Sequence, residues 1–231
     1  MLSLTLISHT PDPLTVILSA ARLCYTGYTP AELTERVKAG EYGAEKDARL
    51  LHELYLSGHH SVFEHVSFTF GVSGLSRVSS HQLVRHRVAT YSQQSQRYVK
   101  QGGTVVRPPS IEKSGAVSVF EKTADFSREA YRQLVEMGVP AEDARYILPH
   151  GCETNIIFTM NARELLHFLS LRLCRRAQWE IRDLSLMMLD KVNGVLPEVF
   201  RYAGPPCYVD GKCPEPPKRS CGEPWTRTEV K

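Results

Sequence analysis

The sequence lacks any apolar run that approaches the roughly 20 residues needed for a membrane-spanning helix. Its first eight residues lack both a basic region and an apolar core of signal-peptide length. It also has little excess of one charge, because 28 Lys and Arg oppose 25 Asp and Glu, for a formal net charge of +3. We therefore expect a cytoplasmic protein, with neither a membrane nor a nucleic acid as its partner.

Several common catalytic and nucleotide-binding motifs are missing. Neither Gly-x-Gly-x-x-Gly nor a glycine-rich phosphate loop ending in Lys-Ser or Lys-Thr occurs. Residues 71–74, Gly-Val-Ser-Gly, are one residue short of a nucleophile elbow. The zincin pattern fails because Leu56 stands where a second histidine should follow His52 and Glu53. We expect no metal site built on such a motif.

The six cysteines do not form the pattern of a disulfide framework. Three are dispersed through segments that are expected to be structured, which favours free, buried thiols in a reducing compartment. The other three stand together near the end of the chain, where zinc binding is an alternative. Their wide spacing without a Cys-x-x-Cys pair argues against that alternative. The dispersed cysteines are Cys24, Cys152 and Cys174, and the grouped ones are Cys207, Cys213 and Cys221.

With 231 residues, of which 42% are hydrophobic and 23% charged, the chain can bury a sizeable core. We predict an α+β fold: a single mixed domain over 1–204, with a small antiparallel-type sheet and several packed helices, followed by an irregular Pro/Cys-rich tail over 205–231. Strands are predicted over 2–8, 66–72 and 152–160. Helices are predicted over 13–25, from Pro30, and over 47–56, 75–87, 116–137, from Asn161, 177–192 and 197–202.

One polar stretch, residues 81–98, is poorly suited to a packed core. Its sequence is His-Gln-Leu-Val-Arg-His-Arg-Val-Ala-Thr-Tyr-Ser-Gln-Gln-Ser-Gln-Arg-Tyr. Unpaired charged and amide groups are costly to bury. Guanidinium groups, however, bind phosphate at two points, and glutamine both donates and accepts hydrogen bonds. The stretch is therefore either a solvated basic loop or a site for an anionic, amide-rich ligand.

Three further segments carry polar groups that allow a functional or a structural interpretation. Residues 58–65, Gly-His-His-Ser-Val-Phe-Glu-His, could be a hydrogen-bonded turn. Residues 161–182 begin with a capping-box pattern and place Arg163 and His167 on one side of a helix. Arg172 lies a quarter-turn or more away, where a cation can also simply complete the helix dipole. Residues 144–149, Ala-Arg-Tyr-Ile-Leu-Pro, indicate by themselves only a surface cation.

Arg85-His86-Arg87, then seven residues, then Ser95 strongly resembles the signature of the flavin-dependent thymidylate synthases. The Asn161-x-Arg163 start that runs into Arg-Ala-Gln-Trp-Glu-Ile resembles a second family segment, and residues 58–65 resemble its flavin-binding stretch. The resemblance implies methylation of dUMP to dTMP, with methylenetetrahydrofolate as the carbon donor. NADPH would reduce bound FAD, and the reduced flavin would supply the hydride. It also implies a homotetramer whose flavin sites are shared between subunits.

The resemblance also implies which residues contact each ligand. Arg172 would be catalytic, because a permanent cation stabilises an ionised uracil ring, and no cysteine would be the nucleophile. Gln93 stands where some members carry Glu, and His167 where some carry Asn. The implied FAD contacts are Ser61, Glu64, Arg85, His86, Arg87, Asn161, Arg163 and His167. The implied dUMP contacts are Gln82, Leu83, Val84, Arg85, Gln93, Gln94, Ser95, Gln96, Arg97, Arg145 and Arg172.

Two alternatives come from other classes of protein. One is a nucleic-acid-binding module that uses residues 85–100 on phosphates. The other is a metal hydrolase that uses His59, His60, Glu64 and His65. An absorption spectrum separates both alternatives from the flavin-dependent enzyme, because only that enzyme requires oxidised flavin bands. A colourless protein with bound zinc would support the metal hydrolase.

Overall fold

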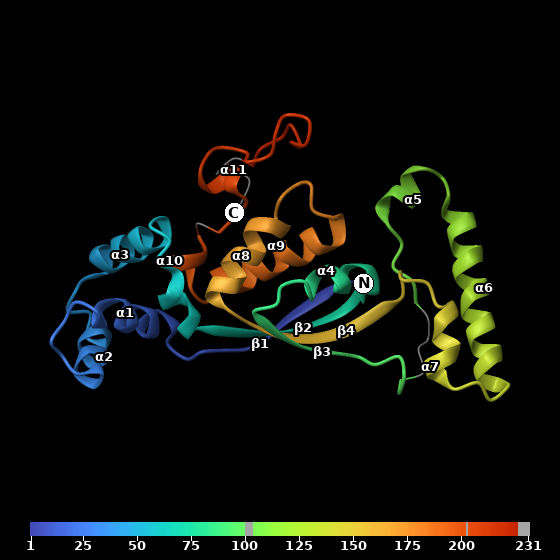
Figure 1. Cartoon of the computed structure of the whole chain (residues 1–231), viewed down its shortest axis with the longest axis horizontal. Coiled ribbons are helices and arrows are strands. Elements are labelled where there is room, and N and C mark those ends of the chain that lie inside the picture. Colours follow the sequence, from blue (N-terminus) through green and yellow to red (C-terminus); the bar gives the residue numbers. More distant parts are fainter. Residues whose placement is uncertain (100–103, 202, 226–231) are drawn as a thin grey trace. The chain divides into compact units, whose positions relative to one another are not determined.

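The structure, a computed structural model, describes residues 1–99, 104–201 and 203–225. Its strands are β1 (Ser3–His9), β2 (Ser67–Ser76), β3 (Ala89–Gln93) and β4 (Glu153–Asn161). They form one small antiparallel sheet in the order β1-β2-β4-β3 (Figure 1). The α+β expectation is confirmed.

The helices account for most of the remaining described chain, and the predicted ones start within a few residues of their expected positions. One helix prediction is wrong at both ends: the helix expected over 75–87 begins at Arg77, directly after β2, and stops at Leu83. The helix expected over 197–202 ends at Phe200, and residue 202 lies outside the described residues. The α-helices are α1 (Pro13–Leu23), α2 (Pro30–Lys38), α3 (Ala44–Leu56), α4 (Arg77–Leu83), α5 (Pro109–Lys113), α6 (Val117–Glu136), α7 (Ala141–Ala144), α8 (Ala162–Arg172), α9 (Trp179–Asn193), α10 (Pro197–Phe200) and α11 (Pro206–Val209), and the 3-10 helices are η1 (His60–His65) and η2 (Arg145–Ile147).

The chain divides into two compact units, and it passes from one to the other within each of the four strands. Unit 1 contains residues 1–5, 71–85 and 91–158. Unit 2 contains residues 6–70, 86–90 and 159 onward. A boundary at residue 204, expected from the change in composition, stays a prediction.

Unit 1 has a core between α6, α7 and the start of β4. Tyr131, Ala144, Leu148 and Cys152 are buried together, and four partly buried aliphatic residues pack against them: Val105, Leu134, Val135 and Val139. Along β4, which was predicted as a strand over 152–160, buried and more exposed side chains alternate, as the period of two in a strand requires. This core holds the first part of β4 in place. The polar groups of unit 1 lie beside that part of the strand.

Unit 2 has a core of phenylalanines and leucines. The ring of Phe68 in β2 stacks on Phe70 with centroids 6.5 Å apart and meets Phe200 of α10 edge-on at 5.6 Å. Phe63 of η1 and Phe168 of α8 are fully buried in the same unit. Each fully buried side chain of this size stabilises the fold by roughly 1.5–3 kcal/mol relative to exposure. α8, which carries most of the polar groups of unit 2, packs against η1 and α9.

The described part of the tail belongs to unit 2 and packs around the loop that follows α8. It is irregular over most of its length, as expected, but includes α11. The indole nitrogen of Trp225 donates a hydrogen bond to the carbonyl of Leu173 at 2.8 Å, and the guanidinium of Arg175 lies 4.3 Å from the ring centroid. Among the described residues, no helix combines the length and the apolar character needed to cross a membrane.

Gly74 in β2 should tolerate substitution worse than Gly40. Both have positive φ angles, of 72° and 69°, so substitution by alanine should lower the unfolding free energy by about 1–2 kcal/mol at either position. Only at Gly74 would the added Cβ also overlap the backbone of Met1, whereas it meets open space at Gly40. Urea denaturation should therefore show a larger loss of unfolding free energy for Gly74→Ala than for Gly40→Ala. Equal losses would contradict the close approach of Met1.

Candidate active site

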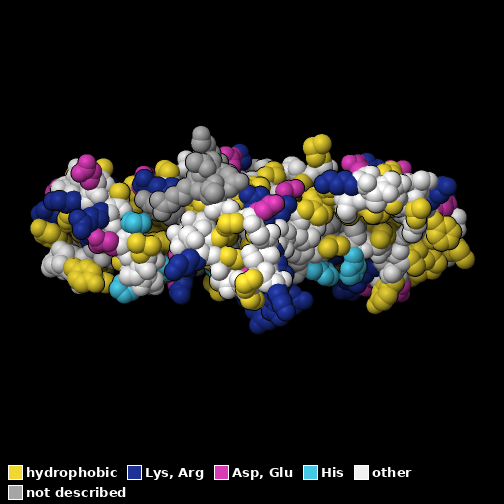
Figure 2. Space-filling model, turned by 90° about the horizontal axis from the view of Figure 1, so that it is seen from above, with side chains coloured by type: hydrophobic (Ala, Val, Ile, Leu, Met, Phe, Trp, Pro, Cys, Tyr) yellow, Lys and Arg dark blue, Asp and Glu magenta, His cyan; other side chains and the backbone are white. Residues whose placement is uncertain are grey.

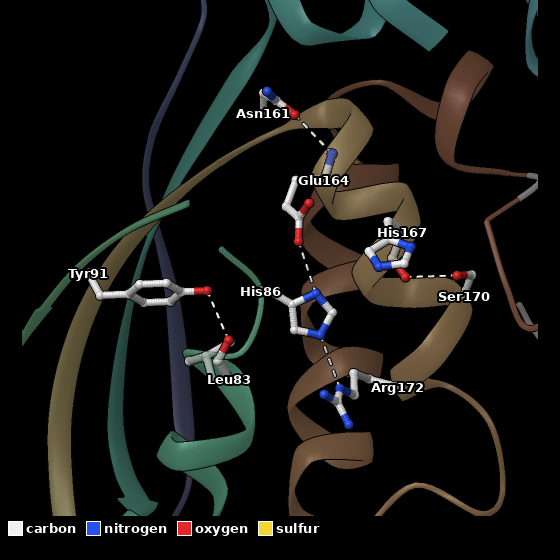
Figure 3. A network of polar contacts seen from close by, with 8 residues as sticks. All are labelled: Leu83, His86, Tyr91, Asn161, Glu164, His167, Ser170 and Arg172. Carbon is white, nitrogen blue, oxygen red and sulfur yellow. Dashed lines mark hydrogen bonds and ion pairs between the residues drawn. The ribbon is translucent and has the colours of Figure 1, made fainter. Parts of the chain in front are cut away.

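A chain of polar contacts runs along α8 in unit 2 (Figure 3). The side-chain oxygen of Asn161 accepts a hydrogen bond from the backbone nitrogen of Glu164 at 2.9 Å, as expected for an N-cap. The second half of the expected capping box is missing. The Glu164 carboxylate instead lies 3.0 Å from Nδ1 of His86, and both side chains are almost fully buried. A buried carboxylate requires such a partner, because an unpaired charge is costly in the interior.

His86 is bonded through both of its ring nitrogens. The Nε of Arg172 donates to Nε2 of His86 at 3.1 Å. A guanidinium can only donate, so this Nε2 carries no proton. The proton of the neutral ring is then on Nδ1 and is donated to Glu164. The arrangement therefore requires the neutral Nδ1–H tautomer of His86.

The electrostatic surroundings favour this protonation state. Burial lowers the pKa of His86 from its ordinary value of 6.5, the hydrogen bond to Glu164 raises it, and the charges of Arg172 and His167 lower it. Burial also lowers the pKa of Arg172, which nevertheless stays charged near neutral pH. A neutral imidazole thus lies between a carboxylate and a guanidinium.

A cavity of about 570 Å³ lies on the side of α8 that carries Arg163 and His167. The Arg163 guanidinium forms an ion pair with Glu64 of η1. The imidazole of His60 stacks on Tyr55 with ring centroids 5.5 Å apart. The lining residues are Tyr55, His60, Glu64, Val88, Asn161, Arg163, Glu164, Leu166, His167 and Ser170.

This cavity brings together four of the residues expected to contact FAD: Glu64, Asn161, Arg163 and His167. Of the other expected FAD contacts, Ser61 and Arg87 are exposed in unit 2, Arg85 is exposed in unit 1, and His86 is buried. The donor set fits part of a flavin dinucleotide. A guanidinium suits its phosphates, the amide and imidazoles suit its polar ring edges, and the apolar lining suits its ring faces.

Several cavity residues were not predicted from the sequence. Tyr55 lies near the end of a helix whose apolar spacing is that of a core helix, and His60 was expected only as a metal ligand. Val88 follows the Arg-His-Arg segment, and Leu166 belongs to a leucine-rich helix. Apolar residues at helical spacing carry no signal that separates a core position from a cavity wall, so only the neighbouring polar residues could have marked them.

Unit 1 contains a second polar group, built on β3. No strand was predicted in this stretch, but residues 89–93 form an edge strand, and the backbone nitrogen of Gln94 donates to Asn155 in β4 at 2.9 Å. The amide nitrogen of Gln93 donates to the hydroxyls of Ser80 at 3.1 Å and Thr154 at 3.2 Å. The sheet therefore fixes where this amide points.

Three guanidinium groups of unit 1 donate hydrogen bonds within that unit, and two of them share one partner residue. Arg97 donates to the carboxylate of Glu142 at 2.7 Å, and Arg145 donates to the backbone carbonyl of the same residue at 3.0 Å. Arg77 donates to the carbonyl of Gln94 at 3.0 Å. Burial lowers the pKa of Arg77, and the charge of Arg145 lowers it further, so these two cations are close enough to repel each other. A bound phosphate would offset that repulsion.

Arg77 was not predicted as a site residue, although a signal was present. It is the first residue of α4, and the first turn of that helix contains no acidic residue. A cation at a helix N-terminus opposes the helix dipole, so it needs another explanation such as an anionic ligand.

The remaining residues expected to contact dUMP also lie in unit 1. The carbonyl of Leu83 accepts a hydrogen bond from the Tyr91 hydroxyl at 2.9 Å (Figure 3). The Ser95 hydroxyl accepts from the backbone nitrogen of Arg97 at 3.1 Å, and Gln96 is buried. The side chain of Gln94 accepts from that of Asn155 at 3.1 Å. Gln82 and Val84 flank Leu83, and Gln82 is half-buried whereas Val84 is exposed.

The two alternative functions gain little from the structure. Of the four proposed metal ligands, His60 stacks on Tyr55 and Glu64 pairs with Arg163. Within the described part of the chain, no three His, Cys, Asp or Glu side chains are grouped so that they could hold a metal ion. On the face shown in Figure 2, Lys and Arg side chains stand among hydrophobic, acidic and other side chains instead of forming one continuous basic surface.

Four cysteines line another cavity of unit 2, of about 370 Å³, next to Arg172. They are Cys174, Cys207, Cys213 and Cys221, all with free thiols. Cys174 lies two residues beyond the end of α8 at Arg172. Cys152, in unit 1, is buried, and burial raises the pKa of its thiol.

The chain is similar to a known protein family, to proteins with related sequences and to a solved structure. A family model described as "Thymidylate synthase complementing protein" (Thy1) matches residues 5–198. A flavin-dependent thymidylate synthase of Geobacter sulfurreducens is 51% identical over 218 residues, covering 93% of this chain and 91% of that protein. One of Clostridium tetani is 45% identical over 236 residues, covering 94% and 92%. The crystal structure of a UMP/dUMP methylase, PolB from Streptomyces cacaoi bound with 5-Br dUMP, is similar in fold, with a TM-score of 0.77 at 24% identity over 87% of this chain and 93% of that one.

The lowered pKa of His86 predicts a pH dependence of stability. Between that pKa and the value of 6.5 in the unfolded chain, the unfolded state binds more protons, so the unfolding free energy rises with pH across this window. His86→Gln removes the titrating group. The difference in unfolding free energy between the wild type and this variant should therefore increase as the pH rises toward 6.5 and level off above it. Chemical denaturation at a series of pH values measures this, and a pH-independent difference would contradict it.

Proposed function

Since the chain belongs to the Thy1 family of thymidylate synthase complementing proteins, we propose that it is a flavin-dependent thymidylate synthase, which methylates dUMP to dTMP. The proposal includes FAD as cofactor, methylenetetrahydrofolate as carbon donor and NADPH as reductant. The observation that carries it is the guanidinium of Arg172, which is half-buried at the end of α8 and hydrogen-bonded to a buried imidazole.

Arg172 is the proposed catalytic residue. A guanidinium that stays charged stabilises negative charge on the uracil ring, which raises the electron density at the carbon to be methylated. Such stabilisation acts most strongly where water is excluded, and Arg172 is half-buried. Bound FAD, once reduced, supplies the hydride that completes the methyl group.

Most of the residues proposed to hold the flavin lie in unit 2, and one of them, Arg85, lies in unit 1. Arg163 would bind phosphate once it exchanges Glu64 for the ligand, and Asn161 and His167 would bind polar edges of the cofactor. The other four residues proposed to contact FAD do not line the cavity: three are exposed and one is buried. We propose that the exposed ones contribute to flavin sites shared between the subunits of a homotetramer. These residues are Ser61, Arg85 and Arg87, and the buried one is His86.

Residues of unit 1 are proposed to hold dUMP. Arg97 and Arg145 would bind its phosphate, since both lie at Glu142 and neither is deeply buried. Arg77, close to Arg145, would add to the positive potential there. The side-chain carbonyl oxygen of Gln93 would accept a hydrogen bond from the ligand, because the hydrogen bonds to Ser80 and Thr154 both use the amide nitrogen. The remaining proposed contacts are Gln82, Leu83, Val84, Arg85, Gln94, Ser95 and Gln96. A cytoplasmic location also stays a prediction.

The proposal is tested on the purified protein. It should show the absorption bands of oxidised flavin, lose them on addition of NADPH in the absence of oxygen, and form dTMP from dUMP when methylenetetrahydrofolate is present. Omission of NADPH is the control. A colourless protein that cannot be loaded with FAD, or a flavoprotein that forms no dTMP, would refute the proposed function.

Arg145→Ala should weaken dUMP binding much more than flavin binding. Loss of one charge-assisted phosphate contact costs about 1.5–3 kcal/mol, or roughly ten- to a hundred-fold in affinity. Arg132→Ala is the matched control, because Arg132 is an exposed arginine of α6 that pairs with Glu129 and Glu136. Isothermal titration calorimetry with dUMP measures both. If the two variants bind dUMP equally, Arg145 is only a surface cation.

No cysteine should act as the nucleophile. A catalytic thiol needs a lowered pKa, whereas burial raises the pKa of Cys152. Cys174 lines the cavity beside Arg172 and is therefore the cysteine to test alongside it. The Cys152→Ser/Cys174→Ser double variant should hold FAD and form dTMP. A folded, FAD-containing double variant without turnover, together with a trapped uracil–cysteine adduct in the wild type, would show the opposite.

A further inference from the structure

We propose that His86 is a positioning residue, which holds the guanidinium of Arg172 in its reactive orientation and is itself held by Glu164. The proposal rests on the proposed function, because it concerns the residue that would activate the uracil. It gives the imidazole a task that is separate from a side-chain contact with flavin. Any contact of residue 86 with the cofactor would then fall to its backbone.

The spacing of the residues on α8 supports this role. Glu164, Phe168 and Arg172 are four residues apart, so they form one stripe along the helix. His86 touches all three: it lies 3.0 Å from the carboxylate, meets the Phe168 ring edge-on at 4.8 Å between centroids, and lies 3.1 Å from Nε of Arg172. One imidazole therefore connects the first and the last turn of the helix.

The protonation state makes the contact directional. Only the Nδ1–H tautomer donates to Glu164 and accepts from Arg172 at the same time. In the other tautomer, or in the imidazolium, a proton on Nε2 would face the donor of Arg172. The charged and titratable groups around the ring are Glu164, Arg172 and His167, and the ring of His167 lies 5.7 Å away between centroids. Burial keeps the imidazole neutral near neutral pH.

The atom used on Arg172 explains why the contact would affect catalysis. The hydrogen bond to His86 uses Nε, so it fixes the plane of the guanidinium and the direction in which Nη1 and Nη2 point. An arginine side chain loses rotamer entropy when it is held in one orientation. Holding it before the substrate binds removes that cost from the chemical step, and misplacement by about 1 Å can reduce a rate by a factor on the order of a hundred.

Two variants of His86 separate positioning from packing. The carbonyl of Gln reaches the place of Nε2 and can accept from Arg172, whereas the shorter Asn reaches only the place of Nδ1. In FAD-loaded enzyme, His86→Gln should keep kcat within a few-fold of the wild type. His86→Asn should lower kcat by a factor on the order of ten to a hundred, with FAD content and thermal midpoint close to those of His86→Gln. Equal kcat values for both variants would overturn the proposal.

A second measurement does not depend on turnover. Nitrogen NMR of the protein labelled in its histidines should show, at neutral pH, a neutral Nδ1–H imidazole whose signal vanishes in His86→Gln. An Nε2–H tautomer or an imidazolium at this position would overturn the proposal. If the enzyme forms no dTMP, the proposed function fails while the tautomer still tests the hydrogen bonds. If it forms dTMP and the Gln and Asn variants match the wild type, only the positioning role fails.

Discussion

The buried imidazole of His86 donates a hydrogen bond to Glu164 and accepts one from Arg172. It thereby connects two segments that are 78 and 86 residues apart in the sequence. The two contacts join the Arg-His-Arg segment to α8 within unit 2 and allow a carboxylate to be buried in the first turn of that helix. Both depend on one protonation state. A second proton on His86 would place like charges next to each other at Arg172, and the same change would weaken the packing of α8. The residue proposed for chemistry and the stability of its helix thus depend on the same neutral ring.

Much of the fold could be predicted because its signals are local. Thr29, directly before the predicted helix start at Pro30, forms a full capping box with Glu32, and the strand predicted over 152–160 is β4. β3 was missed because Thr-Tyr-Ser-Gln lacks an apolar face, and its place in the sheet comes from pairing with β4, some 60 residues away. Such long-range pairing is decided by the partner strand, so no local pattern in residues 89–93 could indicate it.

The site could be predicted as a set of segments, but not as a set of contacts. The helical spacing of Arg163, His167 and Arg172 correctly separated the cavity side of α8 from the stripe that meets His86. Glu164 was interpreted as part of a capping box, because the alternative partner lies in a distant segment. For the same reason His86 was expected to contact flavin, although both of its ring nitrogens are engaged within the protein. Residue type and spacing limit what a group can do, and tertiary packing decides which partner it meets.

The docked tail has a consequence for how members of this family can diverge. The family match ends at residue 198, yet the cavity beside Arg172 has one wall made from residues 205–225, including Trp225. A segment beyond the residues that the family model matches therefore contributes to the surroundings of the proposed catalytic arginine. Changes in the length or composition of this segment would alter how solvent and small molecules reach Arg172 without changing any residue that α8 or the Arg-His-Arg segment contributes. In evolutionary terms, access to the reactive group can vary while the chemistry is inherited unchanged.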